Sequence, residues 1–86
     1  MDNKVLIKLI VPELDETYDV FVPVNEVMWK VKAMLVKCIC DLNYLEFTPK
    51  DEYILINKVD GTIYNNNEIV INTNIRNGTE LFVFSK

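Results

Sequence analysis

The segment NEVMWKVKAMLVKCICDLN, Asn25 to Asn43, decides the fold of this 86-residue chain. It is the one stretch long and periodic enough to predict a helix, whereas the rest of the sequence is typical of short strands and turns. Asn25 is suited to be the N-cap, because its side-chain oxygen can accept a hydrogen bond from an amide of the first turn. Glu26 adds negative charge at the positive end of the helix dipole. The pattern therefore predicts a sheet folded around one helix.

This segment has two apolar surfaces, although a helix in a small domain needs only one. The broader stripe is expected to face the core and consists of Val27, Met28, Val31, Met34, Leu35, Cys38, Ile39 and Leu42. A charged ridge on the opposite side consists of Glu26, Lys30, Lys37 and Asp41. The second apolar strip lies between them and consists of Trp29, Ala33, Val36 and Cys40. This strip is either a surface that binds a partner or a surface that a later segment of the chain covers. The sequence favours neither interpretation over the other.

Length, composition and charge limit the class of protein. The chain is 50% hydrophobic, which is enough for a single domain spanning residues 1–86 that needs neither disulfides nor a metal. A net charge of −4 and nine scattered Lys and Arg residues argue against a nucleic-acid partner. No apolar run approaches the length of a membrane span, and no signal peptide is recognisable. We therefore expect no membrane insertion and a cytoplasmic location.

The cysteines and the absence of histidine limit the chemistry. Cys38 and Cys40 point to sides of the predicted helix about 200° apart, so they cannot share a metal or bond to each other. We expect Cys38 in the core and Cys40 on the second strip, both reduced. Without histidine, no Ser/His/Asp or Cys/His catalytic set can form. The acids Glu13, Asp15 and Glu16 are typical of a solvated turn. The sequence predicts no enzyme activity, no catalytic residues, no cofactor and no metal.

The segments outside the helix predict strands joined by turns. The expected strands are Val5–Val11, Tyr18–Val22, Tyr53–Val59 and Thr79–Phe84, with shorter elements at Thr62–Tyr64 and Glu68–Ile71. Acidic residues Glu13–Thr17 form the first turn, and Asp60-Gly61 and Asn77-Gly78 form later ones. Phe47 and Ile75 are expected to be buried. The helix returns the chain beside the first strand, so the first and last strands should be parallel and central. The prediction is an α+β fold, the β-grasp.

Four local signatures in this order resemble ubiquitin-like proteins over nearly the whole chain. They are the opening hairpin, Val31-Lys32-Ala33, Phe47-Thr48-Pro49, and the ending NIRNGTELFVF from Asn74 to Phe84. Within that fold, YDVFVP at Tyr18–Pro23 and the spacing of Gly61 to Leu81 are similar to the YukD/EsaB family of type VII secretion loci in Gram-positive bacteria. The resemblance implies a ubiquitin-like β-grasp of four or five strands.

The same resemblance implies a function through protein contact. Such a protein is expected to be a cytosolic accessory or regulatory component, with a membrane subunit or the ATPase of the secretion machine as partner. Conjugation is not expected, because the sequence ends Phe84-Ser85-Lys86 rather than in the Gly-Gly tail of ubiquitin-like modifiers. The alternatives are a self-associating structural β-grasp protein, a possible homodimer, and an adaptor unrelated to secretion.

Two surfaces are candidates for protein binding. In the last strand Leu81 and Val83 should face the helix, which places Phe82 and Phe84 on the outer face of the sheet. In the third strand we place Ile54 and Ile56 inward and Leu55 outward. The first candidate is the outer patch Leu55, Phe82 and Phe84, and the second is the helix strip with Trp29 and Val36. The outer patch has an alternative interpretation, in which it is covered by Lys8, Tyr53 and a dimer mate. Contiguous exposed Leu and Phe residues favour the interpretation as a binding site.

Overall fold

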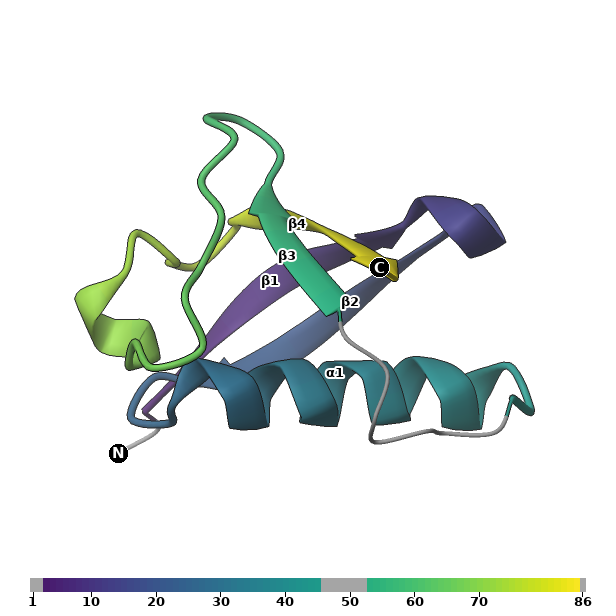
Figure 1. Cartoon of the computed structure of the whole chain (residues 1–86), viewed down its shortest axis with the longest axis horizontal. Coiled ribbons are helices and arrows are strands. Elements are labelled where there is room, and N and C mark those ends of the chain that lie inside the picture. Colours follow the sequence, from purple (N-terminus) through teal and green to yellow (C-terminus); the bar gives the residue numbers. More distant parts are fainter. Residues whose placement is uncertain (1–2, 46–52, 86) are drawn as a thin grey trace.

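The computed structural model describes residues 3–45 and 53–85 and has a mixed sheet packed on one helix. Its elements are β1 (Lys4–Val11), the 3-10 turn η1 (Pro12–Leu14), β2 (Glu16–Pro23), α1 (Met28–Leu42), β3 (Tyr53–Asn57), the 3-10 turn η2 (Val70–Asn72) and β4 (Glu80–Ser85). The four strands have the order β2-β1-β4-β3. Figure 1 shows α1 running along one face of this sheet. The predicted ubiquitin-like β-grasp is confirmed.

The central strands β1 and β4 are parallel, as the sequence predicted, and both outer strands pair antiparallel to them. The first hairpin closes more tightly than expected, since β2 begins at Glu16 rather than Tyr18. Asp15 adopts a left-handed backbone with φ of 52°, and its amide donates to the carbonyl of Pro12. Aspartate tolerates this conformation, so the turn ends at Asp15 and Glu16 pairs with Val11.

The start of α1 differs from the prediction. The helix begins at Met28, with Val27 as N-cap and no capping side chain, so the assignment of Asn25 as N-cap was wrong. The amide of Met28 donates to the carbonyl of Glu68 at 2.7 Å, and that of Trp29 to the carbonyl of Asn66 at 3.1 Å. Backbone carbonyls from a distant loop thus satisfy the first-turn amides that a side chain otherwise would.

The buried side of α1 is also rotated relative to the predicted stripe. Its buried residues are Met28, Val31, Leu35, Val36, Ile39 and Cys40. Cys38 and Leu42 were predicted to be buried and are exposed, whereas Cys40 was placed on the second strip and is buried. Val36 and Cys40 are buried, and they line one pocket together with Tyr53 of β3 and Val83 of β4. A later segment therefore covers this part of the second strip.

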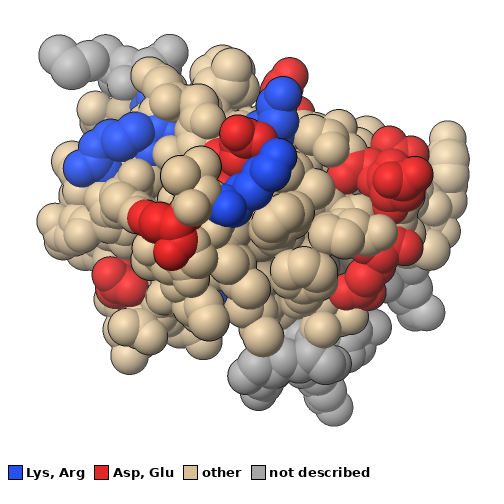
Figure 2. Space-filling model, turned by 90° about the horizontal axis from the view of Figure 1, so that it is seen from above, with Lys and Arg blue, Asp and Glu red and all other residues tan. Residues whose placement is uncertain are grey.

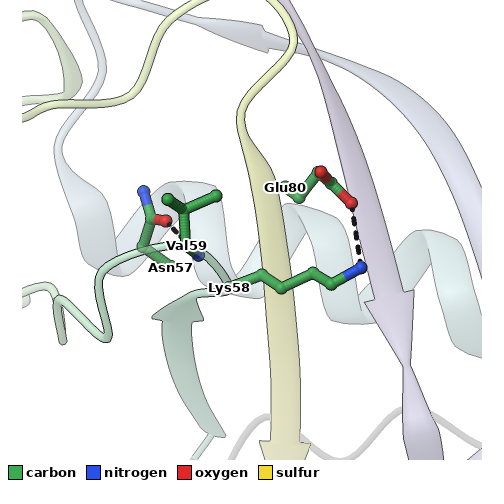
Figure 3. Close-up of polar contacts among 4 residues, drawn as sticks. All are labelled: Asn57, Lys58, Val59 and Glu80. Carbon is green, nitrogen blue, oxygen red and sulfur yellow. Dashed lines mark hydrogen bonds and ion pairs between the residues drawn. The ribbon is translucent and has the colours of Figure 1, made fainter.

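After α1, the observed strand β3 stops at Asn57, two residues before the predicted end at Val59. The side-chain oxygen of Asn57 accepts from the amide of Val59 at 2.9 Å (Figure 3), so the chain turns at this point. Gly61 completes the turn with φ of +74°, a backbone that glycine adopts readily. The expected strand at Thr62–Tyr64 contributes one bridge, between Ile63 and Ile56.

Residues before β4 complete the core. Ile75 is 1% exposed, as predicted, and Gly78 has a positive φ at the expected turn. The element expected at Glu68–Ile71 is a bridge from Ile69 to Val27 followed by η2. Phe47, the predicted anchor of the helix-exit loop, lies outside the described residues.

A polar cluster lies beside the turn at Asp60-Gly61, with Asn57 and Tyr64 buried and Asn74 and Asp60 exposed. The amide nitrogen of Asn57 donates to the hydroxyl of Tyr64 at 3.1 Å, and that hydroxyl donates to the side-chain oxygen of Asn74. Burial raises the pKa of Tyr64, which keeps the hydroxyl protonated as a donor. The side chain of Asn74 in turn donates to Asp60. The cluster therefore connects β3, the turn after it and the segment before β4.

Candidate protein-binding face

The outer face of the sheet is the face that α1 does not cover (Figure 1). Phe82 and Phe84 lie on it, as predicted, because Leu81 and Val83 of the same strand are buried. The placement of Leu55 on this face was wrong, since Leu55 is 0% exposed. It pairs with the buried Val83 in the antiparallel register of β3 and β4.

The isoleucines on either side of Leu55 take the outward positions instead. Ile54 pairs with Phe84, and Ile56 pairs with Phe82. From the other side, Ile10 of β1 pairs with Phe82. We call these five partly buried residues the apolar block; it consists of Ile10, Ile54, Ile56, Phe82 and Phe84. The two phenylalanine rings lie 5.8 Å apart and are tilted by 40°, a geometry typical of a favourable aromatic pair.

A line of four charged residues runs beside the apolar block, across β2, β1 and β4 to the end of β3. The register places Asp19 of β2 opposite Lys8 of β1, and Lys8 opposite Glu80 of β4. Lys58, directly after β3, completes the line, because its amide donates to the carbonyl of Glu80 at 3.0 Å. We call this line, Asp19–Lys8–Glu80–Lys58, the charge row. Figure 2, seen from above the sheet, shows blue and red atoms meeting in the middle of a largely tan face.

One ion pair of the charge row is formed within the chain. The ammonium of Lys58 lies 3.3 Å from a carboxylate oxygen of Glu80, and Figure 3 shows the lysine side chain reaching across β4 to it. The two side chains are 48% and 35% exposed. Because solvent screens such a pair, it contributes only about 0–1 kcal/mol to stability. Both charges are therefore free to interact with a partner at little cost.

A second apolar contact on this face was missed by the sequence analysis. Leu6 of β1 lies directly opposite Phe21 of β2, and they are 39% and 62% exposed. The signal was present, since the alternation that places Val20 and Val22 inward also places Phe21 outward. The outer face is thus apolar on both sides of the charge row.

The second candidate surface, on α1, is smaller than predicted. Trp29 is 52% exposed, and the ammonium of Lys30 lies 5.4 Å from its ring centroid. Val36, however, is only 3% exposed, so its assignment to a partner surface was wrong. Lys32, on the same side, donates to the carbonyl of Tyr64 and to the side chain of Asn66. The strip is therefore reduced to Trp29 and Ala33.

A pocket of about 160 Å³ lies between the second half of α1 and the ends of β1 and β4. It is lined mainly by apolar side chains that include Leu14 and Cys40, with Glu13 and Ser85 also in its lining. The Glu13 carboxylate accepts from the amide of Ser85 at 2.8 Å and from its hydroxyl at 2.9 Å. These bonds, that from the amide first, lower the pKa of Glu13. The volume is below the roughly 300–1,000 Å³ of typical ligand sites.

Residues 3–45 and 53–85 contain neither a candidate metal site nor a helix that could span a membrane. Within these ranges no group of three or more Cys, Asp or Glu residues is placed to hold a metal ion. In the same ranges no helix is both long and apolar enough to cross a bilayer.

Comparison with known proteins gives structural neighbours but no sequence relatives. No protein-family model and no curated protein matches the chain. Among solved structures, it is similar to a chain of the "MycP5-free ESX-5 inner membrane complex", with a TM-score of 0.78 and 17% identity over 98% of this chain and 21% of that one. It therefore spans about a fifth of that larger chain.

Two other neighbours are isolated domains. One is the EccD5 ubiquitin-like domain from Mycobacterium xenopi, with a TM-score of 0.67 and 12% identity over 96% of this chain and 94% of that one. The other is a ubiquitin-like domain of an Arabidopsis thaliana protein, with a TM-score of 0.70 and 18% identity over 98% of this chain and 79% of that one. At these identities the similarity shows the fold, which is that of ubiquitin-like domains.

Proposed function

We propose that this chain is a non-conjugated ubiquitin-like interaction module that acts in the cytoplasm of a Gram-positive bacterium. In this proposal it is an accessory or regulatory component of a type VII secretion system, of the YukD/EsaB kind. Its partner is a membrane subunit or the ATPase of that machine. It acts by non-covalent contact and carries out no catalysis.

One observation carries the proposal: Phe82 and Phe84 point out of the central strand β4 onto the face opposite α1. Their neighbours Ile54 and Ile56 extend the apolar surface to the edge of the sheet. None of these four side chains is part of the buried core beneath α1. Grouped aromatic and aliphatic residues on a surface are typical of protein-binding sites.

The structural neighbours support the choice of machine. Two of them carry the names of an ESX-5 inner membrane complex and of EccD5, a pairing that matches the secretion resemblance of the sequence. In the larger neighbour the matching part is about a fifth of the chain. A ubiquitin-like domain can therefore be one module of a larger secretion subunit, and we propose that the present chain supplies a comparable module.

The proposal is tested by co-expression with candidate secretion subunits and affinity capture. We expect Phe82→Asp to abolish capture, because a buried unpaired carboxylate in the interface is strongly unfavourable. Ile56→Asp tests the same surface from the edge strand β3, where a substitution disturbs the sheet less. Circular dichroism of both variants checks that the domain is folded.

Trp29→Asp is the matched control, since it places the same charge on the other candidate surface. We expect it to leave capture unchanged. Retained capture by folded Phe82→Asp and Ile56→Asp would contradict docking through the outer face. Loss of capture with Trp29→Asp alone would transfer the binding site to α1.

A further inference from the structure

We propose that the outer face of the sheet binds a second copy of this chain, face to face, through a two-fold axis parallel to the strands. The observation behind this inference is the alternation of the charge row. Across β2, β1, β4 and the end of β3 the signs are negative, positive, negative and positive, for Asp19, Lys8, Glu80 and Lys58. When a second copy of the row is laid against the first in the reverse order, every charge lies opposite a charge of the other sign.

The symmetry of a homodimer supplies this reversal. When two sheets stack through a two-fold axis that runs along the strands between β1 and β4, β1 of each copy faces β4 of the other. Lys8 then faces Glu80 of the second copy, and Asp19 faces Lys58 of the second copy. By symmetry each pair occurs twice. All charges of both rows thus lie opposite a charge of the other sign.

Other axes do not give this match. An axis along β1 places Asp19 against Glu80 of the second copy, and an axis along β4 places Lys8 against Lys58 of the second copy. An axis that runs along the charge row itself places each residue against its own equivalent. Like charges across an interface are strongly unfavourable. Axes between β2 and β1 or between β4 and β3 pair opposite charges but leave half of each row without a counterpart. Only the axis between β1 and β4 therefore pairs the whole row with opposite charges.

The apolar block fits the same arrangement. Ile10 and Phe82 are register neighbours on β1 and β4, so the rotation that pairs Lys8 with Glu80 also places Ile10 against Phe82 of the second copy. This apolar contact likewise occurs twice, one row away from the charges. Leu6, on the other side of the row, faces the turn at Gly78 of the second copy, since the amide of Gly78 bonds the carbonyl of Leu6 within each chain.

The size of the face makes the dimer weak. Four strands about 4.8 Å apart and about 20 Å long present on the order of 300–400 Å² per copy. Stable interfaces bury about 1,200–2,000 Å² in total. We therefore expect a dimer that dissociates on dilution. This inference does not rest on the proposed function, but the two meet at Phe82, so that a secretion partner and the second copy compete for one face.

The test uses two charge reversals, Lys8→Glu and Glu80→Lys, and measures association by analytical ultracentrifugation up to millimolar concentration. Each variant alone sets like charges against each other at the two Lys8–Glu80 contacts. When the two variants are mixed, every pair between unlike copies is again of opposite sign. Lys4→Glu is the matched control, because Lys4 also lies on β1 but outside the charge row.

We expect the mean mass of the wild-type protein to rise toward twice the monomer mass with concentration. Each charge reversal alone should weaken association by roughly tenfold or more, the mixture should restore it, and Lys4→Glu should resemble the wild type. A wild-type protein that stays monomeric overturns the proposal, as does a mixture that associates no better than its components. No secretion partner is present, so these results are independent of the capture experiment.

Discussion

The two faces of the β3–β4 pair are both apolar but belong to different environments. On the inner face Leu55, Leu81 and Val83 are at most 3% exposed and pack beneath α1. On the outer face Ile54, Ile56, Phe82 and Phe84 lie in the same two strands and are only partly buried. The core beneath α1 therefore accounts for the inner set, whereas the outer set lies outside that core. We propose that the outer set serves association.

The largest expected effect is that of Leu55→Ala on the inner face. The substitution removes a fully buried side chain and leaves a cavity, which typically lowers the free energy of unfolding by about 2–5 kcal/mol. That is a large part of the roughly 5–15 kcal/mol that stabilises a small domain. Urea denaturation measures the loss. A change well below 1 kcal/mol would contradict the inward orientation of Leu55 and return it to the outer face.

Tyr64→Phe is expected to come next, because it breaks the polar cluster beside the turn at Asp60-Gly61. The change leaves the amide of the buried Asn57 without its acceptor and Asn74 without its donor. An unsatisfied buried polar group costs about 1–3 kcal/mol. Tyr44→Phe is the control, since Tyr44 is 98% exposed. Equal denaturation midpoints for the two variants would show that the cluster adds no stability.

Ile56→Ala tests the outer face directly, one position along β3 from Leu55. Part of this side chain already contacts water, so we expect a loss of about 1 kcal/mol, less than for Leu55→Ala. The pair of substitutions compares the two faces within one strand. A loss equal to that of Leu55→Ala would show that both faces contribute equally to stability, and the assignment of the outer set to association would then fail.

The fold was predictable because its main signals are local in sequence. The periodicity of Asn25–Asn43 and the two Asx-Gly turns specify one helix among strands. The orientation of β3 was not predictable from the sequence. Its residues Tyr53, Ile54, Leu55 and Ile56 are all apolar, so the alternation does not show which of them face the core. Only pairing with β4, whose Val83 is buried, decides it.

The candidate site was predictable in part for the same reason. Phe82 and Phe84 alternate with smaller aliphatic residues and were placed correctly on the outer face. Val36 was placed wrongly, because the helix is apolar on two sides and the sequence does not show which side is buried. Val36 is buried beside a pocket that is also lined by Tyr53 and Val83, which are distant in sequence. The start of α1 depends likewise on carbonyls of Asn66 and Glu68. Such contacts exist only in the folded chain.

The smallest effect is expected at Glu13, where the end of β4 meets the first hairpin. Hydrogen bonds from Ser85 lower the pKa of Glu13 from its ordinary value of 4.5 in the folded state. A lowered pKa means that the native state favours the carboxylate, so this contribution is present above pH 4.5 and is lost as the pH falls through the lowered pKa. In Glu13→Gln that loss should be absent, so the stability of this variant should fall less than that of the wild type as the pH is lowered from 4.5 through the lowered pKa. Asp15→Asn is the control, because asparagine also tolerates the left-handed backbone at this turn. Thermal denaturation over this pH range measures the difference, and identical profiles for Glu13→Gln and the wild type would show that the contact to Ser85 does not hold β4 against the hairpin.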